Sequence, residues 1–484
     1  MGFLGSLFGK KKADPPKAEE KPPQPLGPPA EGTRRVSVVR FENDYPPGLN
    51  WREVVLDGRK HRESYGFTNT NTGQVRVHER SGRAFETEDE ALGAFDRRGR
   101  ERGNWMRATQ SVRDVPNSKW KGTPAPAVNA EHEAVLDAAR GDAFEAAGRV
   151  YADWLVSQND PRGELAALLQ AGKSPDEFLA VNGEALFGDL DVTIGAEISQ
   201  FEWQGGLLRG AALKRQSLDS EWNLEALSAA FLKLPVARFV TSLRFGLENY
   251  EGGNDWGATL GEVAASSRAG AIRSLAFDFY DRDESEISWT SVGALGGRWH
   301  QFASLERLKV RAGAGGSLGE LNLPTLREFV RESGSLNANE LDEIVTAKWP
   351  NLERLEVWTG HPGYGGDSNV GQWRAFFASG GFPSKLKHFG LVNCPYVIEA
   401  WPMLIDSPLL AQLDSLDLSR GVLGDDNVEL LLQAAPKLSK LKSLDLNENV
   451  FSWASVQRLQ AAFPNAQLHD QRDAEPNRYV AVGE

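Results

Sequence analysis

The sequence predicts an α/β fold in which a small α+β unit and a short helical unit precede a long stack of strand-and-return units. The stack is indicated by a repeat: residues 413–421 read LDSLDLSRG, and residues 441–449, 28 positions later, read LKSLDLNEN. Leucines in each copy alternate with polar residues as in a half-buried strand, and the residues that follow have helical spacing. Because one such unit cannot bury its apolar side alone, several must stack side by side.

Both copies carry the leucine-rich repeat signature L-x-x-L-x-L-x-x-N/C, with glycine at the last position of the first copy. Similar apolar pairs predict eight strands, centred on residues 243–245, 275–277, 308–310, 329–331, 355–357, 389–391, 416–418 and 444–446. We therefore predict a leucine-rich repeat solenoid over residues 213–484, with parallel strands on its concave face and a C-terminal cap. Arg331 is an anomaly, because the pattern requires an apolar residue at its position.

Residues 33–107 predict a small α+β domain, because four strand-like stretches precede a helix whose start, Thr87 with Glu90, has capping-box spacing. This domain resembles the WGR family, a module of poly(ADP-ribose) polymerases and some bacterial regulators. The resemblance is carried by Trp51, Leu56-Asp57-Gly58, Tyr65-Gly66, Thr70, Gly73-Gln74 and Glu90-Ala91. Phe67 replaces the name-giving arginine, which in the polymerases helps to contact DNA ends.

A nucleic-acid-associated regulator is the alternative function that this first domain keeps open. Its fifteen Arg/Lys and twelve Asp/Glu residues make it basic, whereas the whole chain has a net charge of −13. The candidate phosphate-binding residues are Arg59, Lys60, Arg62, Arg76, Arg80 and Arg83. The same residues also suit an ordinary solvated strand face, and the acidic remainder of the chain argues against an array that wraps nucleic acid.

Residues 108–130 contain three prolines and predict a linker, and residues 131–212 predict a helical domain. The strings RVYADWL at 149–155 and DPRGEL at 160–165 resemble a bacterial repeat-companion domain, which typically stands just before leucine-rich repeats. That family implies no established activity. Residues 271–484 are similar to a bacterial leucine-rich repeat family of unassigned function, through the segments at 286–289, 364–367 and 478–482.

The first residues, MGFLGSLFGKKK at 1–12, combine an apolar helical face with a basic cluster, which suits shallow docking on an anionic membrane. The residues expected to contact the membrane are Phe3, Leu4, Leu7, Phe8, Lys10, Lys11 and Lys12. A partner-docking peptide and a tail without a specific role stay open as alternatives, and Gly2 with Ser6 also fits an N-myristoylation pattern. Residues 13–32 hold seven prolines and predict a semi-rigid linker.

Composition predicts a protein of a reducing compartment without a membrane span. A single cysteine, Cys394, excludes a disulfide framework. No stretch of 18 apolar residues exists, and the first residues lack the cleavage-type segment of a secretory signal. We expect a cytoplasmic protein, with peripheral contact at the inner face of the membrane through residues 1–12.

No set of residues in the sequence converges on an enzyme, so we expect no catalytic residue, no cofactor and no metal site. The seven histidines are scattered, and no pair has the i, i+4 spacing of a helical metal site. Cys394 occupies a repeat position that is expected to be buried. The glycine-rich residues 313–319 lack the lysine of a phosphate loop, and the acidic residues 278–286 lack the spacing of a calcium loop.

The concave face is the better candidate for function, because the residues that flank its inward leucines are charged and include a tryptophan that we expect to be exposed. The residues expected to bind a protein partner are Arg307, Lys309, Arg311, Arg354, Glu356, Trp358, Tyr364, His388, Asp417 and Asp445. Aromatic and arginine side chains are common anchors of interfaces. We therefore predict a non-enzymatic protein-interaction scaffold or adaptor. A small-GTPase modulator is a weaker alternative, by analogy with the Ran-type activators.

Overall fold

The computed structural model describes residues 29–72, 74–101, 105–215, 220, 222–250, 253–378, 382–473 and 478–483, and of residues 76–80 it describes only the backbone. The expected membrane-contact peptide at 1–12 and most of the proline-rich linker lie outside these residues, as do the side chains of Arg76 and Arg80. Within the described ranges, none of the helices combines the length and the apolar character that a membrane crossing requires.

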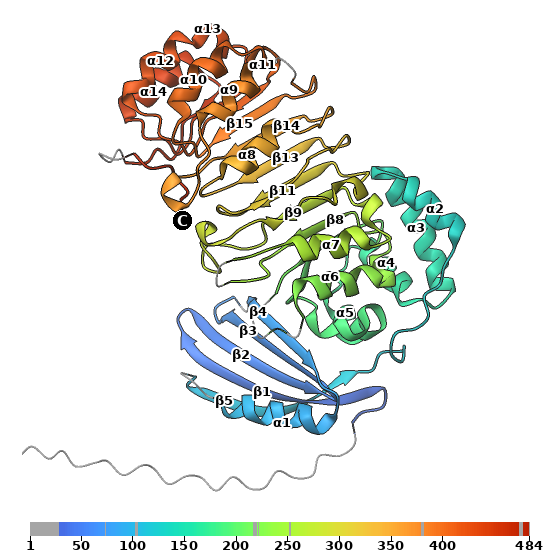
Figure 1. Ribbon diagram of the computed structural model, residues 1–484. Coiled ribbons are helices and arrows are strands. Elements are labelled where there is room, and N and C mark those ends of the chain that lie inside the picture. The colour runs from blue at the N-terminus through green and yellow to red at the C-terminus, as the bar shows by residue number, and fades with distance from the viewer. Residues whose placement is uncertain are drawn as a thin grey trace, which may run out of the picture.

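The first unit is a five-stranded antiparallel sheet with one helix packed against it (Figure 1). Its elements are β1 (Thr33–Tyr45), β2 (Gly48–Asp57), β3 (Lys60–Asn69), β4 (Val75–Ala84), α1 (Glu88–Arg100) and β5 (Arg107–Pro116). Helix α1 begins at the expected capping box, in which the Thr87 and Glu90 side chains each accept a backbone N–H of the other residue at 3.2 Å. Phe41, Val54 and Phe95 are buried between sheet and helix.

Strand β5 changes the expected boundary of this unit. Residues 108–116 were expected to belong to a linker, but they pair antiparallel with β1 from Arg107 opposite Glu42 to Pro116 opposite Thr33. Nearly every side chain of β5 is exposed, so no apolar alternation marks it as a strand. Backbone pairing with the free edge of β1 holds it instead, because an edge strand offers a row of unpaired N–H and C=O groups.

The second unit consists of four helices, a 3₁₀ turn and a hairpin. Its elements are α2 (Ala130–Ala138), α3 (Gly141–Ser157), α4 (Pro161–Gln170), α5 (Asp176–Phe187), η1 (Gly188–Thr193), β6 (Ile198–Gln204) and β7 (Leu207–Leu213). Residues 131–212 were expected to form a helical domain, but the last part of this range forms the hairpin of β6 and β7. The hairpin turn at Gly205-Gly206 requires positive φ angles of 58° and 81°, and a Cβ at Gly206 would lie only 2.8 Å from the Ala166 Cα of α4.

The third unit is built on one large sheet, to which the described residues contribute eleven strands in the order β18-β17-β16-β15-β14-β13-β11-β9-β8-β7-β6. All neighbours from β7 to β18 are parallel, and only β6 is antiparallel. All eight expected strands are found, and Leu416 pairs with Leu444. Their bounds are β8 (Ser242–Phe245), β9 (Ser274–Phe277), β11 (Arg307–Arg311), β13 (Glu328–Glu332), β14 (Arg354–Trp358), β15 (His388–Val392), β16 (Ser415–Asp417) and β17 (Ser443–Asp445), with β18 (Ala466–Gln467) at the edge.

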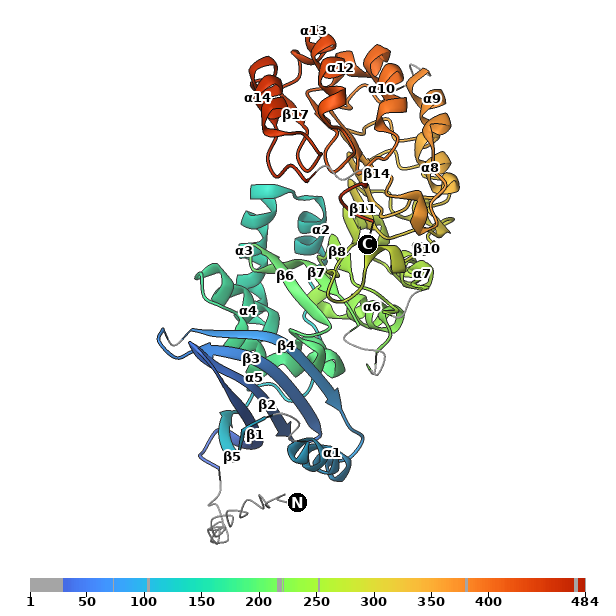
Figure 2. The same ribbon diagram turned by 90° about the vertical axis from the view of Figure 1, so that its left-hand side faces the viewer.

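Helices cover one face of this sheet, so that the strands lie along the inner side of an arc (Figures 1 and 2). The helices are α6 (Leu224–Lys233), α7 (Gly257–Ala265), α8 (Ala338–Val345), α9 (Val370–Ala378), α10 (Val397–Asp406), α11 (Pro408–Gln412), α12 (Val428–Gln433), α13 (Ala435–Leu438) and α14 (Trp453–Ala462). Inward leucines such as Leu308, Leu355 and Leu416 are at most 1% exposed. Each fully buried side chain of this kind contributes about 1.5–3 kcal/mol to folding, which is why the repeats stack.

Arg331 occupies an inward position of β13 and is fully buried, so the expected strand register is correct. Its guanidinium pairs with Glu340 of α8 at 2.7 Å and donates to the carbonyl oxygens of Ala312, Gly313 and Glu332 at 2.6–3.0 Å. The anomaly in the repeat pattern is therefore a buried ion pair whose donors are satisfied, as burial of a charge requires.

The described C-terminal residues 478–483 run along the ends of several strands. Ala481 N–H donates to Arg420 O at 2.9 Å, and Val482 N–H donates to Asn393 Oδ1 at 2.9 Å. A Cβ at Gly334 would lie 2.8 Å from Gly483 O. The segment thus ties β13, β15 and β16 together, while β18 supplies the expected edge of the last repeat.

Candidate functional site

The uncovered face of the large sheet, called the concave face below, carries three rows of side chains that alternate with the buried leucines. Strand register sets these rows, because directly paired residues of neighbouring strands project side by side. The middle row consists of Arg244, Ala276, Lys309, Val330, Glu356, Gly390, Asp417 and Asp445. It is cationic toward β8 and anionic toward β17.

Ion pairs neutralise the end of this face nearest to β8. Lys309 Nζ lies 3.1 Å from Asp278 and 2.8 Å from Glu332. Arg311 lies 3.4 Å from Glu332, and Arg244 lies 2.6 Å from Asp278. Of the residues expected to bind a partner here, Lys309 and Arg311 are therefore partly engaged within the chain, whereas the Arg307 side chain is exposed.

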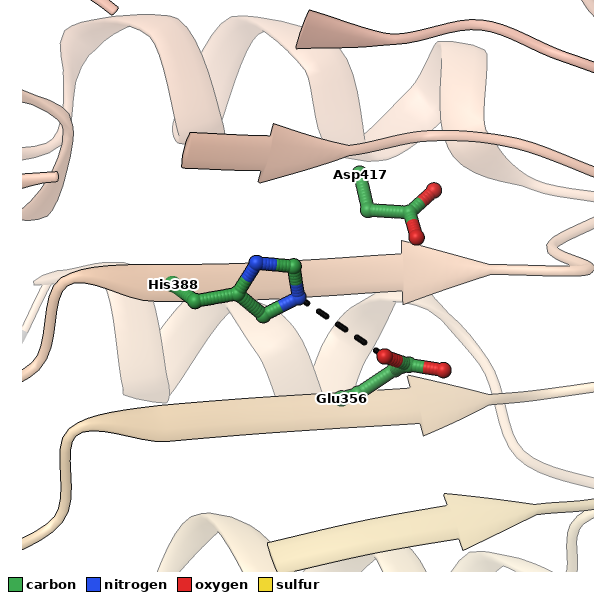
Figure 3. Close-up of side chains that lie close together, drawn as sticks. All are labelled: Glu356, His388 and Asp417. Carbon is green, nitrogen blue, oxygen red and sulfur yellow. Dashed lines mark ion pairs between the residues drawn. The ribbon is translucent and has the colours of Figure 1, made fainter. Parts of the chain in front are cut away.

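At the other end, Glu356, His388 and Asp417 come together from three consecutive strands, β14, β15 and β16 (Figure 3). Each offers one ligand atom, and these atoms all lie within 4.8 Å of one another. The His388 Nε2 atom is 3.7 Å from Glu356 Oε2, which is longer than a hydrogen bond. On its other side, His388 Nδ1 is 2.7 Å from Ser415 Oγ.

Gly390 makes this arrangement possible. It stands in the middle row between Glu356 and Asp417. Because it has no side chain, the imidazole of His388, two residues earlier on β15, leans into the space between the two carboxylates (Figure 3). A Cβ at Gly390 would lie 2.9 Å from Glu356 Cγ. Two further groups orient Glu356: Trp358 Nε1–H donates to Oε1 at 2.8 Å, and Arg354 pairs with Oε2.

The pKa values of the two carboxylates in the cluster are shifted in opposite directions. Burial alone would raise the pKa of Glu356, but the hydrogen bond from Trp358 and the nearby Arg354 and His388 side chains hold that pKa at about 2. Asp417 has its pKa raised to about 6, mainly by burial and further by the charges of Asp445 and Glu356. Burial also raises the pKa of Asp445, which is directly paired with Asp417 across the strands. Like charges in such a pair destabilise a sheet.

Trp358 is buried rather than exposed, which corrects the expectation for this residue. Its side chain is only 9% accessible, because the Arg420 guanidinium lies 5.1 Å from its ring centroid and its indole N–H is bonded to Glu356. A cation above an aromatic face is attracted to it. Trp358 therefore orients Glu356 and is not accessible to a partner.

Tyr364 lies outside the three rows. It ends η6 (Pro362–Tyr364), is 37% exposed, and packs its ring against Gly483 of the C-terminal segment. Its carbonyl oxygen accepts a hydrogen bond from Ser335 Oγ at 2.9 Å. The expected aromatic pair of Trp358 and Tyr364 is thus divided between the concave face and the edge loops.

Two residues of the nucleic-acid alternative, Lys60 and Arg62, contact the second unit, whereas Arg59 and Arg83 are exposed. Lys60 lies 2.6 Å from Glu184 and 2.9 Å from Asp191, and Arg62 lies 2.8 Å from Asp191. Of the other candidates, Arg59 donates to Glu86 O at 3.0 Å and Arg83 lies over the Phe85 ring at 5.1 Å. The ion pairs of Lys60 and Arg62 link β3 to α5 and η1. Figure 1 shows the first sheet beside α5.

The sequence interpretation named Glu356, His388 and Asp417 individually but missed that they converge, and it expected no metal site. A search for i, i+4 spacing finds ligands on one helix, whereas these residues belong to three different repeats. Alignment of the repeats in register would have placed Glu356, Gly390 and Asp417 in one row, with His388 two residues before the glycine. That alignment was the available signal.

Comparison with known proteins shows fold similarity alone. No protein-family model and no curated protein sequence matches the chain. A crystal structure of a Bacteroides fragilis protein from a structural genomics consortium covers 93% of this chain and all of that one, with 19% identity and a TM-score of 0.50. Two further likenesses are too weak to carry an argument. An internalin of Listeria monocytogenes has 11% identity and a TM-score of 0.25, and the match covers 50% of this chain and 71% of that one. A leucine-rich repeat protein of Leptospira interrogans has 14% identity and a TM-score of 0.18, and the match covers 49% of this chain and 74% of that one.

Proposed function

We propose that this protein is a non-enzymatic scaffold whose concave face binds a protein partner through its cationic side chains. One observation carries the proposal: on this face the cationic side chains are more exposed than the carboxylates with which they pair. The side chains of Arg244, Lys309 and Arg354 are 37–41% exposed, whereas Asp278, Glu332 and Glu356 beneath them are 6–11% exposed. A partner that approaches the face meets guanidinium and ammonium groups first.

Such a surface suits a partner with carboxylates at matching spacing. The buried acidic residues hold the arginine side chains in place, which reduces the entropy lost when a partner orders them. Guanidinium groups bind carboxylates in a bidentate fashion and are enriched among interface hot spots. We infer that the partner presents an acidic segment, and that the strength of binding decreases with salt.

The test is affinity purification with the full chain from its source cell, followed by titration of the recovered partner. The face variant combines Arg244→Glu, Arg307→Glu and Arg354→Glu. The control variant combines Arg458→Glu and Lys437→Glu on the outer helices, where these side chains are 54% and 52% exposed. We expect the face variant to lose the partner at least tenfold while the control keeps it. Equal recovery by both variants would refute the proposed surface.

The nucleic-acid alternative has less support, because Lys60 and Arg62 are already engaged with Asp191. In the scaffold proposal the WGR-like unit is a docked neighbour of the repeat-companion-like unit, and neither needs a ligand of its own. Cytoplasmic location and membrane contact through residues 1–12 remain part of the proposal. A liposome flotation assay with and without those residues tests the membrane contact, and equal flotation of both forms would exclude it.

A further inference from the structure

The cluster on β14, β15 and β16 has the donor set of a metal site. It offers one imidazole nitrogen from His388 and one carboxylate oxygen each from Glu356 and Asp417, all within 4.8 Å of one another. Imidazole nitrogen and carboxylate oxygen together suit Zn²⁺ and other divalent first-row transition metals. The three residues come from the stiff middle of a parallel sheet, which holds their backbones in fixed register.

The second observation is the orientation of His388. Its Nε2 atom is buried and, among the described atoms, has no hydrogen-bond partner, yet it points toward the Glu356 carboxylate (Figure 3). Its Nδ1 atom is held by Ser415 Oγ at 2.7 Å. When Nδ1–H donates to Ser415, the lone pair of Nε2 faces a carboxylate oxygen 3.7 Å away. Two acceptors in that position favour a cation between them, and ligating histidines are commonly oriented by a bond at the other ring nitrogen.

The third observation is the surplus of negative charge. Asp417 lies directly opposite Asp445, and Glu356 is in the same row beyond Gly390. Within the residues that the structure describes, neither aspartate has an ion pair with an arginine or lysine: Asp417 accepts the Ser419 N–H, and Asp445 accepts the Asn447 N–H. The nearby Arg420 is turned toward Glu448 at 2.6 Å.

We propose that Glu356, His388 and Asp417 bind one divalent transition-metal ion on the concave face, with Zn²⁺ as the first candidate. Bonds of about 2.0–2.2 Å to these donors require donor–donor distances of about 3–4 Å, so the side chains close slightly around the ion. Trp358 and Arg354 fix the Glu356 carboxylate while it binds. A side chain at Gly390 would crowd Glu356, because a Cβ there would lie 2.9 Å from the Glu356 Cγ.

The test uses the untagged full chain, stripped with a chelator, dialysed, and titrated with ZnCl₂ by calorimetry and with CoCl₂ by absorption spectroscopy. We expect one equivalent of Zn²⁺ per chain and a Co²⁺ d–d spectrum that shows a nitrogen and oxygen donor set. His388→Gln and Asp417→Asn should each weaken Zn²⁺ binding at least tenfold. The matched controls His300→Gln and Asp414→Asn, which are outside the cluster, should bind as the unaltered protein does.

Two results would overturn the proposal. One is an unaltered protein that takes up less than half an equivalent of Zn²⁺ at 100 μM free metal, which would mean that the three side chains need no metal ion between them. The other is a folded His388→Gln or Asp417→Asn variant that binds Zn²⁺ with unchanged affinity, which would place the ion elsewhere. Circular dichroism identifies folded variants, and the measurement on the unaltered protein stands even when a variant does not fold.

Discussion

Arg331 and Glu340 form an ion pair inside the repeat array, 2.7 Å apart, with both side chains fully buried. Asn337 Nδ2 donates to the other Glu340 oxygen at 2.7 Å, so the carboxylate is satisfied on both sides. We predict that Arg331→Met destabilises the protein by about 3–5 kcal/mol, because it leaves a buried carboxylate without its counter-charge. Urea unfolding followed by tryptophan fluorescence measures the change.

The double variant Arg331→Met with Glu340→Leu separates the lost charge pair from lost packing. Replacement of both partners by apolar residues removes the uncompensated charge, so it should recover at least half of the stability that the single variant loses. A double variant as unstable as Arg331→Met alone would show that the guanidinium matters mainly through its bonds to the carbonyl oxygens of Ala312 and Gly313.

Asp191 holds the first and second units together, because its Oδ2 atom lies 2.9 Å from Lys60 and 2.8 Å from Arg62. In Asp191→Asn the two cations lose their shared carboxylate, and hydrogen bonds to charged groups are worth about 1.5–3 kcal/mol each. We predict that trypsin cleaves the connection at Lys119 and Lys121 about tenfold faster or more. Glu177→Gln, on the exposed side of α5, is the control and should leave the cleavage rate unchanged.

Gly360 follows β14 with a φ of +66°, and a Cβ there would lie 1.9 Å from the carbonyl carbon and oxygen of Gly334. Gly360→Ala therefore combines backbone strain with a clash that only movement of two repeats can relieve. We predict a loss of about 2–5 kcal/mol in the free energy of unfolding.

Gly297 has a φ of +86°, but no atom lies within 4 Å of the position that a Cβ would take there. Gly297→Ala should therefore cost only about 1–2 kcal/mol, and equal losses in the two variants would show that the clash is relieved at no cost.

The sequence predicts what local alternation determines. All eight expected strands are found, although Leu418 and Leu446 lie one residue past the ends of β16 and β17. The inward residues Leu416 and Leu444 pair with each other and are both buried. The burial of Arg331 cannot be predicted from this alternation, because it depends on Glu340, which lies nine residues later on a helix. The polar strand β5 is held by backbone pairing and carries no apolar signal.

The candidate site was harder to predict than the fold, because its members are joined by strand register and not by spacing along the chain. His388 reaches Glu356 across a strand pair, and the burial of Trp358 depends on Arg420, which belongs to a later repeat. Polar residues between leucines were correctly expected to line one face. Which of them touch one another depends on side-chain conformations that no periodicity encodes.

Asp160 is the N-cap of α4, and its surroundings predict that the stability of the protein is sensitive to acid. Burial opposes its ionisation, but the hydrogen bonds and charge of Arg162, with the Ala127 and Arg162 N–H groups, keep its pKa below the usual range. A carboxyl with a depressed folded-state pKa contributes stability above its unfolded pKa of about 3.9 and loses it as the pH falls through the folded pKa.

We predict that Asp160→Asn is less stable than the unaltered protein at pH 7. The difference in urea midpoint should shrink as the pH falls below about 4. Asp153→Asn, an exposed site on α3, should follow the unaltered protein at every pH. A gap between Asp160→Asn and the unaltered protein that stays constant from pH 7 to pH 2 would mean that the ionised carboxylate is not what Arg162 stabilises.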